Sequence, residues 1–198
     1  MTEDESFYLY TLKQCRDSNT IVSLYIYPDE PEEYISGFVI DVTQTEVLIL
    51  ALTSAGIYDG YCAIKLSCIR DLYEETDDYG ERLKLLIKKR HKKPSVTVEP
   101  QEDESFVHAV CRTGIDNSRM VSLLTVENEY TGHVAAYDDE HVMLLALDYF
   151  GTNPMGAKLP FANVLMASIG GEYEEVYELL SPFRLIRHNT DDETLSEN

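Results

Sequence analysis

Apolar residues recur at helical spacing in two places, near the start of the chain and just after residue 101. In the first place they fall at Tyr8, Leu12 and Cys15. In the second place they fall at Phe106, Val107, Val110 and Cys111. Both patterns put the apolar side chains on one face of a helix, and the acidic residues just before each stretch suit the positive end of a helix dipole. We therefore predict a helix at each place.

Stretches rich in β-branched and aromatic residues follow each helix and predict strands. In the first half the strands cover residues 21–27, 34–42, 46–52, 61–65 and 68–73, with a one-turn break at 66–67. The last two strands have counterparts at 157–160 and 163–168, and a further helix ends each half at 77–90 and 172–180. Five short antiparallel strands close most economically into a small barrel, because closure removes their edges. The predicted fold is mainly β with flanking helices.

The two halves also echo one another in sequence. EDESF occurs at 3–7 and again at 102–106, and VLILALTSAG from Val47 matches VMLLALDYFG from Val142. Matching residues stay 94–99 positions apart, which indicates duplication of a unit of about ninety residues. The predicted organisation is a first barrel repeat at 1–90, a linker at 91–101, a second barrel repeat at 102–188 and a disordered acidic tail at 189–198.

The third strand, at 46–52, is apolar on both faces. One face carries Val47, Ile49 and Ala51, and the other carries Leu48, Leu50 and Leu52. In the second repeat the latter positions are Met143, Leu145 and Leu147. One set can fill a barrel, and the other needs a cover. A helix of the same repeat is one possible cover. The alternative is a surface for the other repeat or for another subunit.

The pattern of each half resembles that of the Sm-like small barrels. VSLYIYPDEPEEYISGFVIDVTQTEVLIL resembles the first three strands of that family, with a glycine that lets the second strand bend, and DGYCAIKLSCIRDLYEE resembles the last two. The resemblance implies a short N-terminal helix followed by a strongly bent five-stranded barrel.

The RNA-binding signature of that family does not carry over. Sm proteins that bind RNA place an Asp and a nearby Asn between strands two and three, and Arg-Gly or Lys-Gly between strands four and five. Here the first turns read VTQTEV and YDDEHV, without the Asn, and the second read KLSC and KLPFAN, without a basic residue followed by glycine. The residues therefore do not support a uracil-stacking pocket in either repeat.

The net charge of −20 bears on possible partners. An acidic surface repels phosphate, so we expect neither DNA nor an anionic membrane as a partner. One basic cluster departs from this, at Lys88, Lys89, Arg90, Lys92 and Lys93. Positive charge suits the C-terminal end of a helix. The alternatives are docking to an acidic surface of the same protein and a weak contact to nucleic acid.

The four cysteines are Cys15, Cys62, Cys68 and Cys111. They form no C-x-x-C motif and occupy no matching positions in the two repeats, so we expect reduced thiols rather than disulfides or a zinc site. The N-terminal MTEDESF has no apolar region typical of a signal peptide, and no apolar run reaches the roughly 18 residues of a membrane span. The expected location is the cytoplasm.

Candidate chemistry is sparse. His133 and His141 flank an acidic turn, but in one hairpin register they face opposite sides of the strands and in the other they lie roughly 13 Å apart. Neither arrangement suits one metal ion, and we expect no cofactor. Tyr58 and Tyr61 surround Asp59–Gly60 and could form a tyrosine platform for a peptide. No P-loop, nucleophile elbow or H-E-x-x-H motif is present.

The sequence thus favours a non-enzymatic, cytosolic module for binding a protein partner or for self-association. The expected surface comprises Tyr58, Tyr61, Leu48, Leu50, Leu52, Met143, Leu145 and Leu147. The alternative is an Sm-like RNA-associated or ribosome-linked factor, with phosphate contacts from the basic cluster.

Overall fold

The order of secondary-structure elements occurs twice along the chain. The computed structural model describes residues 2–26, 33–90 and 94–181. The first repeat contains α1 (Glu3–Ser18), β1 (Ile21–Tyr25), β2 (Ile35–Val42), β3 (Glu46–Leu52), β4 (Tyr58–Lys65), the short 3-10 helix η1 (Leu66–Cys68), β5 (Asp71–Glu74) and α2 (Asp78–Arg90). The second contains α3 (Phe106–Asn117), β6 (Met120–Thr125), β7 (Glu129–Tyr137), β8 (His141–Ala146), β9 (Met155–Pro160), η2 (Phe161–Asn163), β10 (Val164–Ile169) and α4 (Glu172–Leu180).

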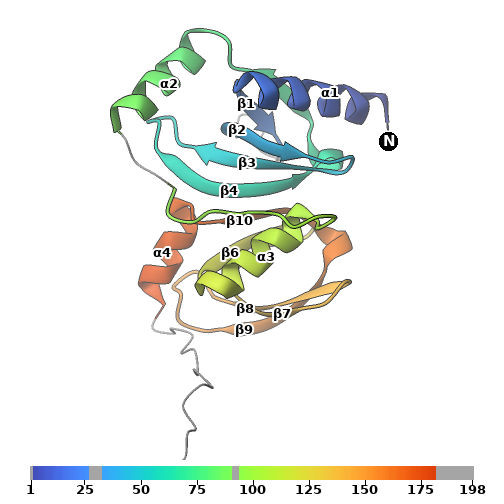
Figure 1. The fold of residues 1–198 in the computed structure, drawn as a ribbon. Coiled ribbons are helices and arrows are strands. Elements are labelled where there is room, and N and C mark those ends of the chain that lie inside the picture. Colours follow the sequence, from blue (N-terminus) through green and yellow to red (C-terminus); the bar gives the residue numbers. More distant parts are fainter. Residues whose placement is uncertain (1, 27–32, 91–93, 182–198) are drawn as a thin grey trace, which may run out of the picture.

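All ten described strands belong to one antiparallel sheet, which confirms the mainly β prediction. Their order is β5-β1-β2-β3-β4-β10-β6-β7-β8-β9. We expected the five strands of each repeat to close on themselves, but the order is open, and β4 pairs with β10 of the other repeat instead of with β5. Figure 1 shows the two repeats stacked with these two strands at the boundary. Each repeat has two edge strands. The pairing of β4 with β10 therefore covers two of these four edges, and the ends of the sheet are β5 and β9.

A glycine lets β2 approach β3 closely. Gly37 pairs with Ala51, and a Cβ atom at Gly37 would lie 2.4 Å from both the Ile49 side chain and the Leu50 carbonyl oxygen. The pairing of β2 with β3 also shifts by one residue between Val39 and Asp41, which bends the strand. The glycine that the sequence marks as a bend is thus required by the packing of the next strand.

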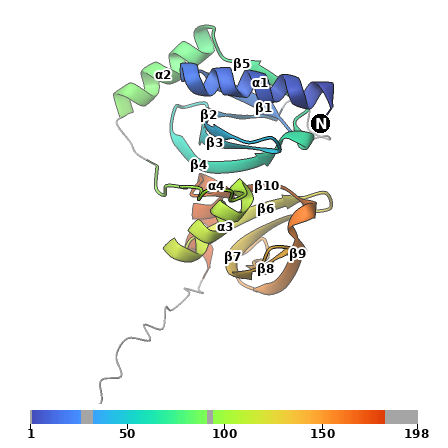
Figure 2. The same ribbon diagram turned by 45° about the vertical axis from the view of Figure 1, so that its right-hand side comes forward.

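Each helix of the first repeat covers a different part of the strands. α1 buries Leu9, Leu12 and Cys15 in an apolar cluster with the strands. α2 places Leu83 over Ile21 and Leu52. Figure 2 shows α1 on the side of the first repeat that faces away from the second, whereas α3 lies next to the boundary. Leu52 is therefore covered from within its own repeat.

The predicted linker packs between the repeats where the structure describes it. Val96 and Val98 are buried in the cluster that joins the second repeat to β3 and β4. Ser95 donates a hydrogen bond of 3.1 Å to the carbonyl oxygen of Gly170. Residues 91–93 of the linker and the predicted tail at 189–198 lie outside the described residues. The stretch from 94 to 98 therefore helps to hold the repeats together.

Candidate interaction surface

The contact between the repeats is a continuous stretch of sheet. β4 and β10 pair over four positions, in the register Ile64 with Met166 to Tyr61 with Ile169. Just beyond the last of these pairs, the ammonium group of Lys65 donates hydrogen bonds of 2.9 Å to two carbonyl oxygens of the segment after β9. Burial lowers the pKa of this lysine. The backbone pairing fixes the register of one repeat against the other.

An acidic side chain of the first repeat caps the first helix of the second. The carboxylate of Glu46 accepts hydrogen bonds from the Ser105 hydroxyl, at 2.9 and 3.0 Å, and from the backbone N–H of Phe106, at 2.6 Å. The side chain of Ser105 makes no capping bond within its own helix. A carboxylate at this end also satisfies the helix dipole. Glu46 is itself buried, so the cap is part of the contact between repeats.

A second acidic cap comes from the start of β4. The carboxylate of Asp59 accepts a hydrogen bond of 2.8 Å from the backbone N–H of Glu172, the first residue of α4. Both helices of the second repeat thus begin against carboxylates of the first. This arrangement ties the strands of one repeat to the helix ends of the other.

α3 is buried on two faces, because it lies between its own strands and those of the first repeat. It contacts β6, β7 and β10 of its own repeat and also β3 and β4. Phe106, Ala109 and Thr113 recur at i, i+3 and i+7 and are all buried. Leu48, fully buried, belongs to the same apolar cluster as Phe106 and Ala109. The apolar outer face of β3 is therefore covered by the second repeat, with Leu50 packed at its margin.

The equivalent face of the second repeat is uncovered in the single chain. Strand pairing makes Met143 the counterpart of Leu48, and Leu145 the counterpart of Leu50. Met143 is 51% exposed and Leu145 37%, whereas Leu48 is 0% exposed. Leu147, just after β8, is half-buried. The sequence prediction had assigned the positions of both repeats to one expected surface. In the structure, the positions of the first repeat are covered, whereas Met143 and Leu145 of the second are exposed.

The residues beside Met143 also differ from their counterparts at the internal contact. By the same pairing, Lys158 replaces the buried Ala63, and Gly156 replaces Tyr61. A Cβ atom at Gly156 would meet nothing within 4 Å, so this part of β9 is open. We refer to Met143, Leu145, Gly156 and Lys158, with the outer edge of β9, as the β8–β9 face.

The predicted tyrosine platform is divided between two environments. Tyr61 is buried and hydrogen-bonds to the side chain of Thr97 in the linker. Tyr58 is half-buried and packs against the cluster beneath α2. Tyr61 thus contributes to the contact between repeats, and the two rings do not form one exposed patch.

The described part of the basic cluster lies on the last turn of α2. Lys88, Lys89 and Arg90 are exposed there, and the Arg90 guanidinium donates a hydrogen bond of 3.1 Å to the carbonyl oxygen of Ala55. Lys92 and Lys93 lie outside the described residues. Positive charge at this C-terminal end of α2 interacts favourably with the helix dipole.

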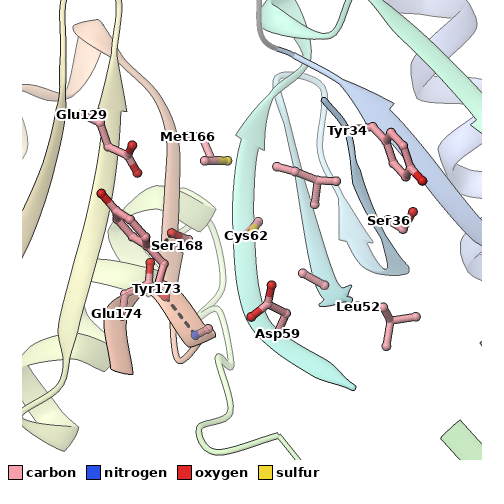
Figure 3. A pocket seen from close by; sticks show the side chains of 13 residues that line it. Tyr34, Ser36, Leu52, Asp59, Cys62, Glu129, Met166, Ser168, Tyr173 and Glu174 are labelled. Carbon is pink, nitrogen blue, oxygen red and sulfur yellow. Dashed lines mark hydrogen bonds between the residues drawn. The ribbon is translucent and has the colours of Figure 1, made fainter. Parts of the chain in front are cut away.

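A small pocket opens across the boundary between the repeats (Figure 3). It has a volume of about 290 Å³ and three carboxylates in its lining, those of Asp59, Glu129 and Glu174. Glu174 accepts hydrogen bonds from the Ser168 hydroxyl, at 2.6 Å, and from the backbone N–H of Gly171, at 2.9 Å. Burial, and then the charge of Glu174, raise the pKa of Glu129. Among the described residues that line it there is no lysine or arginine, so this lining disfavours anions.

The two histidines that flank the acidic turn, His133 and His141, lie in different environments. His133 is buried under α4, whereas His141 lies at the turn beside Asp138. The four thiols are free, and burial raises the pKa of Cys68 to about 11 and that of Cys15 to about 12. Within residues 2–26, 33–90 and 94–181, no three His, Cys, Asp or Glu side chains are grouped to hold a metal ion.

An apolar groove beside α4 was missed by the sequence reasoning. It has a volume of about 600 Å³ and is lined largely by Tyr149, Phe150, Tyr173, Val176, Tyr177 and Leu180. The signal that could have found it is the pair Tyr149–Phe150 in the loop after β8, where the first repeat has Ser54 and Ala55. Both rings are highly exposed.

No helix in the described part of the chain is both long enough and apolar enough to cross a membrane. Comparisons with protein-family models, with curated proteins and with solved structures give no match.

Proposed function

We propose that this protein is a non-enzymatic, cytosolic protein-interaction module built from two small barrels of the Sm-like type, and that the β8–β9 face is its binding surface. Each barrel is left open between its fourth and fifth strands. Support for the fold comes from the element order, from the close approach at Gly37 and from the single-turn helix at Leu66–Cys68. The free thiols agree with a reducing compartment.

The observation that carries the proposal is the difference between Leu48 and Met143. The same strand position is fully buried in one repeat and 51% exposed in the other. An apolar side chain on a sheet face gains free energy when a partner removes it from water, by roughly 25 cal/mol per Å² of apolar surface. Because the first repeat obtains this cover from another folded unit, the second repeat presents a surface shaped for a similar cover.

Site-specific cross-linking tests this proposal. A photoreactive amino acid replaces Met143 in the full chain, and a matched control replaces Val126, which is exposed in the turn between β6 and β7. Both proteins are irradiated in the cells that produce them. We expect a protein adduct from position 143 and none from position 126. If position 143 gives no protein adduct, or gives the same adducts as position 126, the face is not a protein-binding surface.

A further inference from the structure

The apolar groove beside α4 is lined by a helix face that lacks a cover. Tyr173, Val176, Tyr177 and Leu180 recur at i, i+3, i+4 and i+7, which places them on one side of the helix, here called the α4 stripe. Tyr173 and Leu180 are each 50% exposed, and Val176 is 45% exposed. An apolar stripe at this spacing normally faces a core. Within the described residues, most of this one is open.

The first repeat shows what covers the corresponding place. Arg90, in the last turn of α2, donates a hydrogen bond of 3.1 Å to the carbonyl oxygen of Ala55, in the loop after β3. A Cβ atom at Gly56 of the same loop would lie 2.6 Å from the Cβ atom of Leu86. The last part of α2, from Leu86 to Arg90, therefore covers this loop.

The helix of the second repeat ends before it gives the same cover. A Cβ atom at Gly151 would lie 2.9 Å from the Cβ atom of Leu180, so Leu180 holds the place that Leu86 has in α2. α4 ends at this residue, whereas α2 continues to Arg90. Ser181 is extended, as is typical of a residue before a proline, and the proline prevents a further helical turn. The cover must therefore come from a segment that is not a continuation of α4.

The seven residues that follow Ser181 have a composition that fits the groove. Their sequence, PFRLIRH at 182–188, contains three large apolar residues and two arginines. In the loop after β8, the rings of Tyr149 and Phe150 are 81% and 70% exposed. The charged residues among the described lining are two acids, Asp59 and Glu172. Both the apolar side chains and the arginines of the segment thus have complementary partners in the groove.

The segment is also long enough to lie along the groove. α4 begins at the boundary between the repeats, where the backbone N–H of Glu172 binds Asp59, and it ends away from that boundary (Figure 1). The distance along the helix from Leu180 back to Glu172 is about 12 Å. Seven extended residues span at most about 24 Å, so the chain can reverse and run back along α4. A segment tethered this closely has a local concentration on the order of millimolar, which favours it over an untethered peptide.

We propose that residues 182–188 of the same chain occupy the groove beside α4. Their three apolar side chains pack on the α4 stripe and on the exposed rings of the loop after β8. Arg184, the counterpart of Arg90 at a spacing of 94 residues, lies at that loop, and Arg187 lies at Asp59. Because Asp59 belongs to the first repeat, the segment acts as a strap that holds α4 against the first repeat. The contact uses no residue of the β8–β9 face and is independent of the proposed function.

Tryptophan fluorescence tests this contact, because the native chain contains no tryptophan. Phe183→Trp in the full chain places a single reporter in the segment and keeps an aromatic ring there. Two alterations of the groove are then made in this reporter protein. Val176→Arg copies Arg82, which holds the same place in α2, and Tyr149→Ser combined with Phe150→Ala copies the loop of the first repeat.

The matched control is Leu179→Arg in the same reporter protein. Leu179 is 86% exposed on α4 and lies outside the lining of the groove. The control therefore adds the same charge to the same helix without altering the groove. Circular dichroism checks that each full-length protein folds.

We expect the emission of the reporter protein to be shifted to the blue of that of the same protein in concentrated urea. Quenching by acrylamide should be at least about twofold weaker in the reporter protein than in either groove variant. The control should match the reporter protein. Because the contact lies within one chain, the emission should stay constant over a hundredfold range of protein concentration.

Other results overturn the inference. Emission at the urea position in the folded reporter protein, or groove variants that leave emission and quenching unchanged, would show that the segment lies outside the groove. A blue shift that disappears on dilution would assign the groove to a segment of a second copy and would contradict a contact within one chain. Equal losses in Leu179→Arg and Val176→Arg would show that the signal depends on the charge of α4 and not on the groove.

Discussion

The carboxylate of Glu46 accepts a 2.6 Å hydrogen bond from the backbone N–H of Phe106, sixty residues later in the chain. This bond joins the start of β3 in the first repeat to the start of α3 in the second. It also explains why one sequence has two local structures. EDES is helical within α1, where Thr2 provides a cap, but it precedes the helix in the second repeat, where α3 begins at Phe106 against Glu46.

Replacing Glu46 tests how much this cap contributes to the free energy of unfolding. Glu46→Ala leaves the N–H of Phe106 and the hydroxyl of Ser105 without their acceptor, so we expect the free energy of unfolding to fall by about 2 kcal/mol. Glu46→Gln keeps one acceptor oxygen and should cost less. Equilibrium unfolding in urea measures both changes, with fluorescence and circular dichroism compared to check for a single transition.

The matched control is Glu127→Ala, at an exposed glutamate in the turn after β6. Its side chain is in solvent, so its removal should alter the free energy of unfolding by less than about 0.5 kcal/mol. Equal effects at Glu46 and Glu127 would mean that the cap contributes nothing beyond an ordinary surface charge.

The counterparts Leu48 and Met143 should respond differently to the same truncation. Leu48→Ala opens a cavity between the repeats and should reduce the free energy of unfolding by about 3 kcal/mol. Met143→Ala removes an exposed side chain, so in dilute protein the change should stay within about 0.5 kcal/mol. Urea unfolding at low protein concentration measures the pair. Similar losses at the two positions would contradict the difference in burial.

The elements themselves could largely be predicted from the sequence, because they follow local patterns. The helix at 172–180 and the strand at 46–52 have the expected bounds, and the break at 66–67 is the short helix Leu66–Cys68. The bend at Gly37 also follows from the sequence, since a glycine in a strand of β-branched residues indicates a close approach of backbone.

The contact between repeats could not be predicted, because it depends on which edges meet in space. The alternation in β3 showed that Leu48 needs a cover, but a helix of the same repeat and the other repeat fit that pattern equally. Leu48 and Met143 lie in matching sequence patterns and carry the same local signals, so sequence reasoning interprets the two positions alike. Their different burial arises from the pairing of β4 with β10, which no local pattern encodes.

Two glycines offer a test of the strand packing. Gly37→Ala forces a Cβ atom to within 2.4 Å of the Leu50 carbonyl oxygen, and the backbone must shift, so we expect a loss of at least about 2 kcal/mol in the free energy of unfolding. Gly156→Ala meets nothing within 4 Å and should change that free energy by less than about 0.5 kcal/mol. Thermal and urea unfolding measure both, and a tolerated alanine at Gly37 would contradict the close approach of β2 and β3.

His133 is the titrating group whose burial most directly predicts a pH dependence. It occupies in β7 the place that Phe38 has in β2, and its Nδ1 atom has no hydrogen-bond partner within the described residues. Burial lowers its pKa, although the charge of Glu178 and a hydrogen bond to the backbone of Arg119 oppose that shift. The folded protein therefore favours the neutral ring.

Because the pKa of His133 is lower in the folded than in the unfolded protein, the unfolded chain binds the proton first as the pH falls. The stability that the neutral ring provides is complete above the unfolded pKa of about 6.5, and it is lost as the pH falls from there toward the folded pKa. His133→Phe, which copies Phe38, removes this contribution. Glu129 and other carboxylates titrate in both proteins, so the difference between the two unfolding free energies isolates the histidine. Urea unfolding should show that the native chain loses stability relative to the His133→Phe variant as the pH falls from 7.5 to 5.5. Parallel pH profiles of the two proteins would show that the ring does not titrate in the interior.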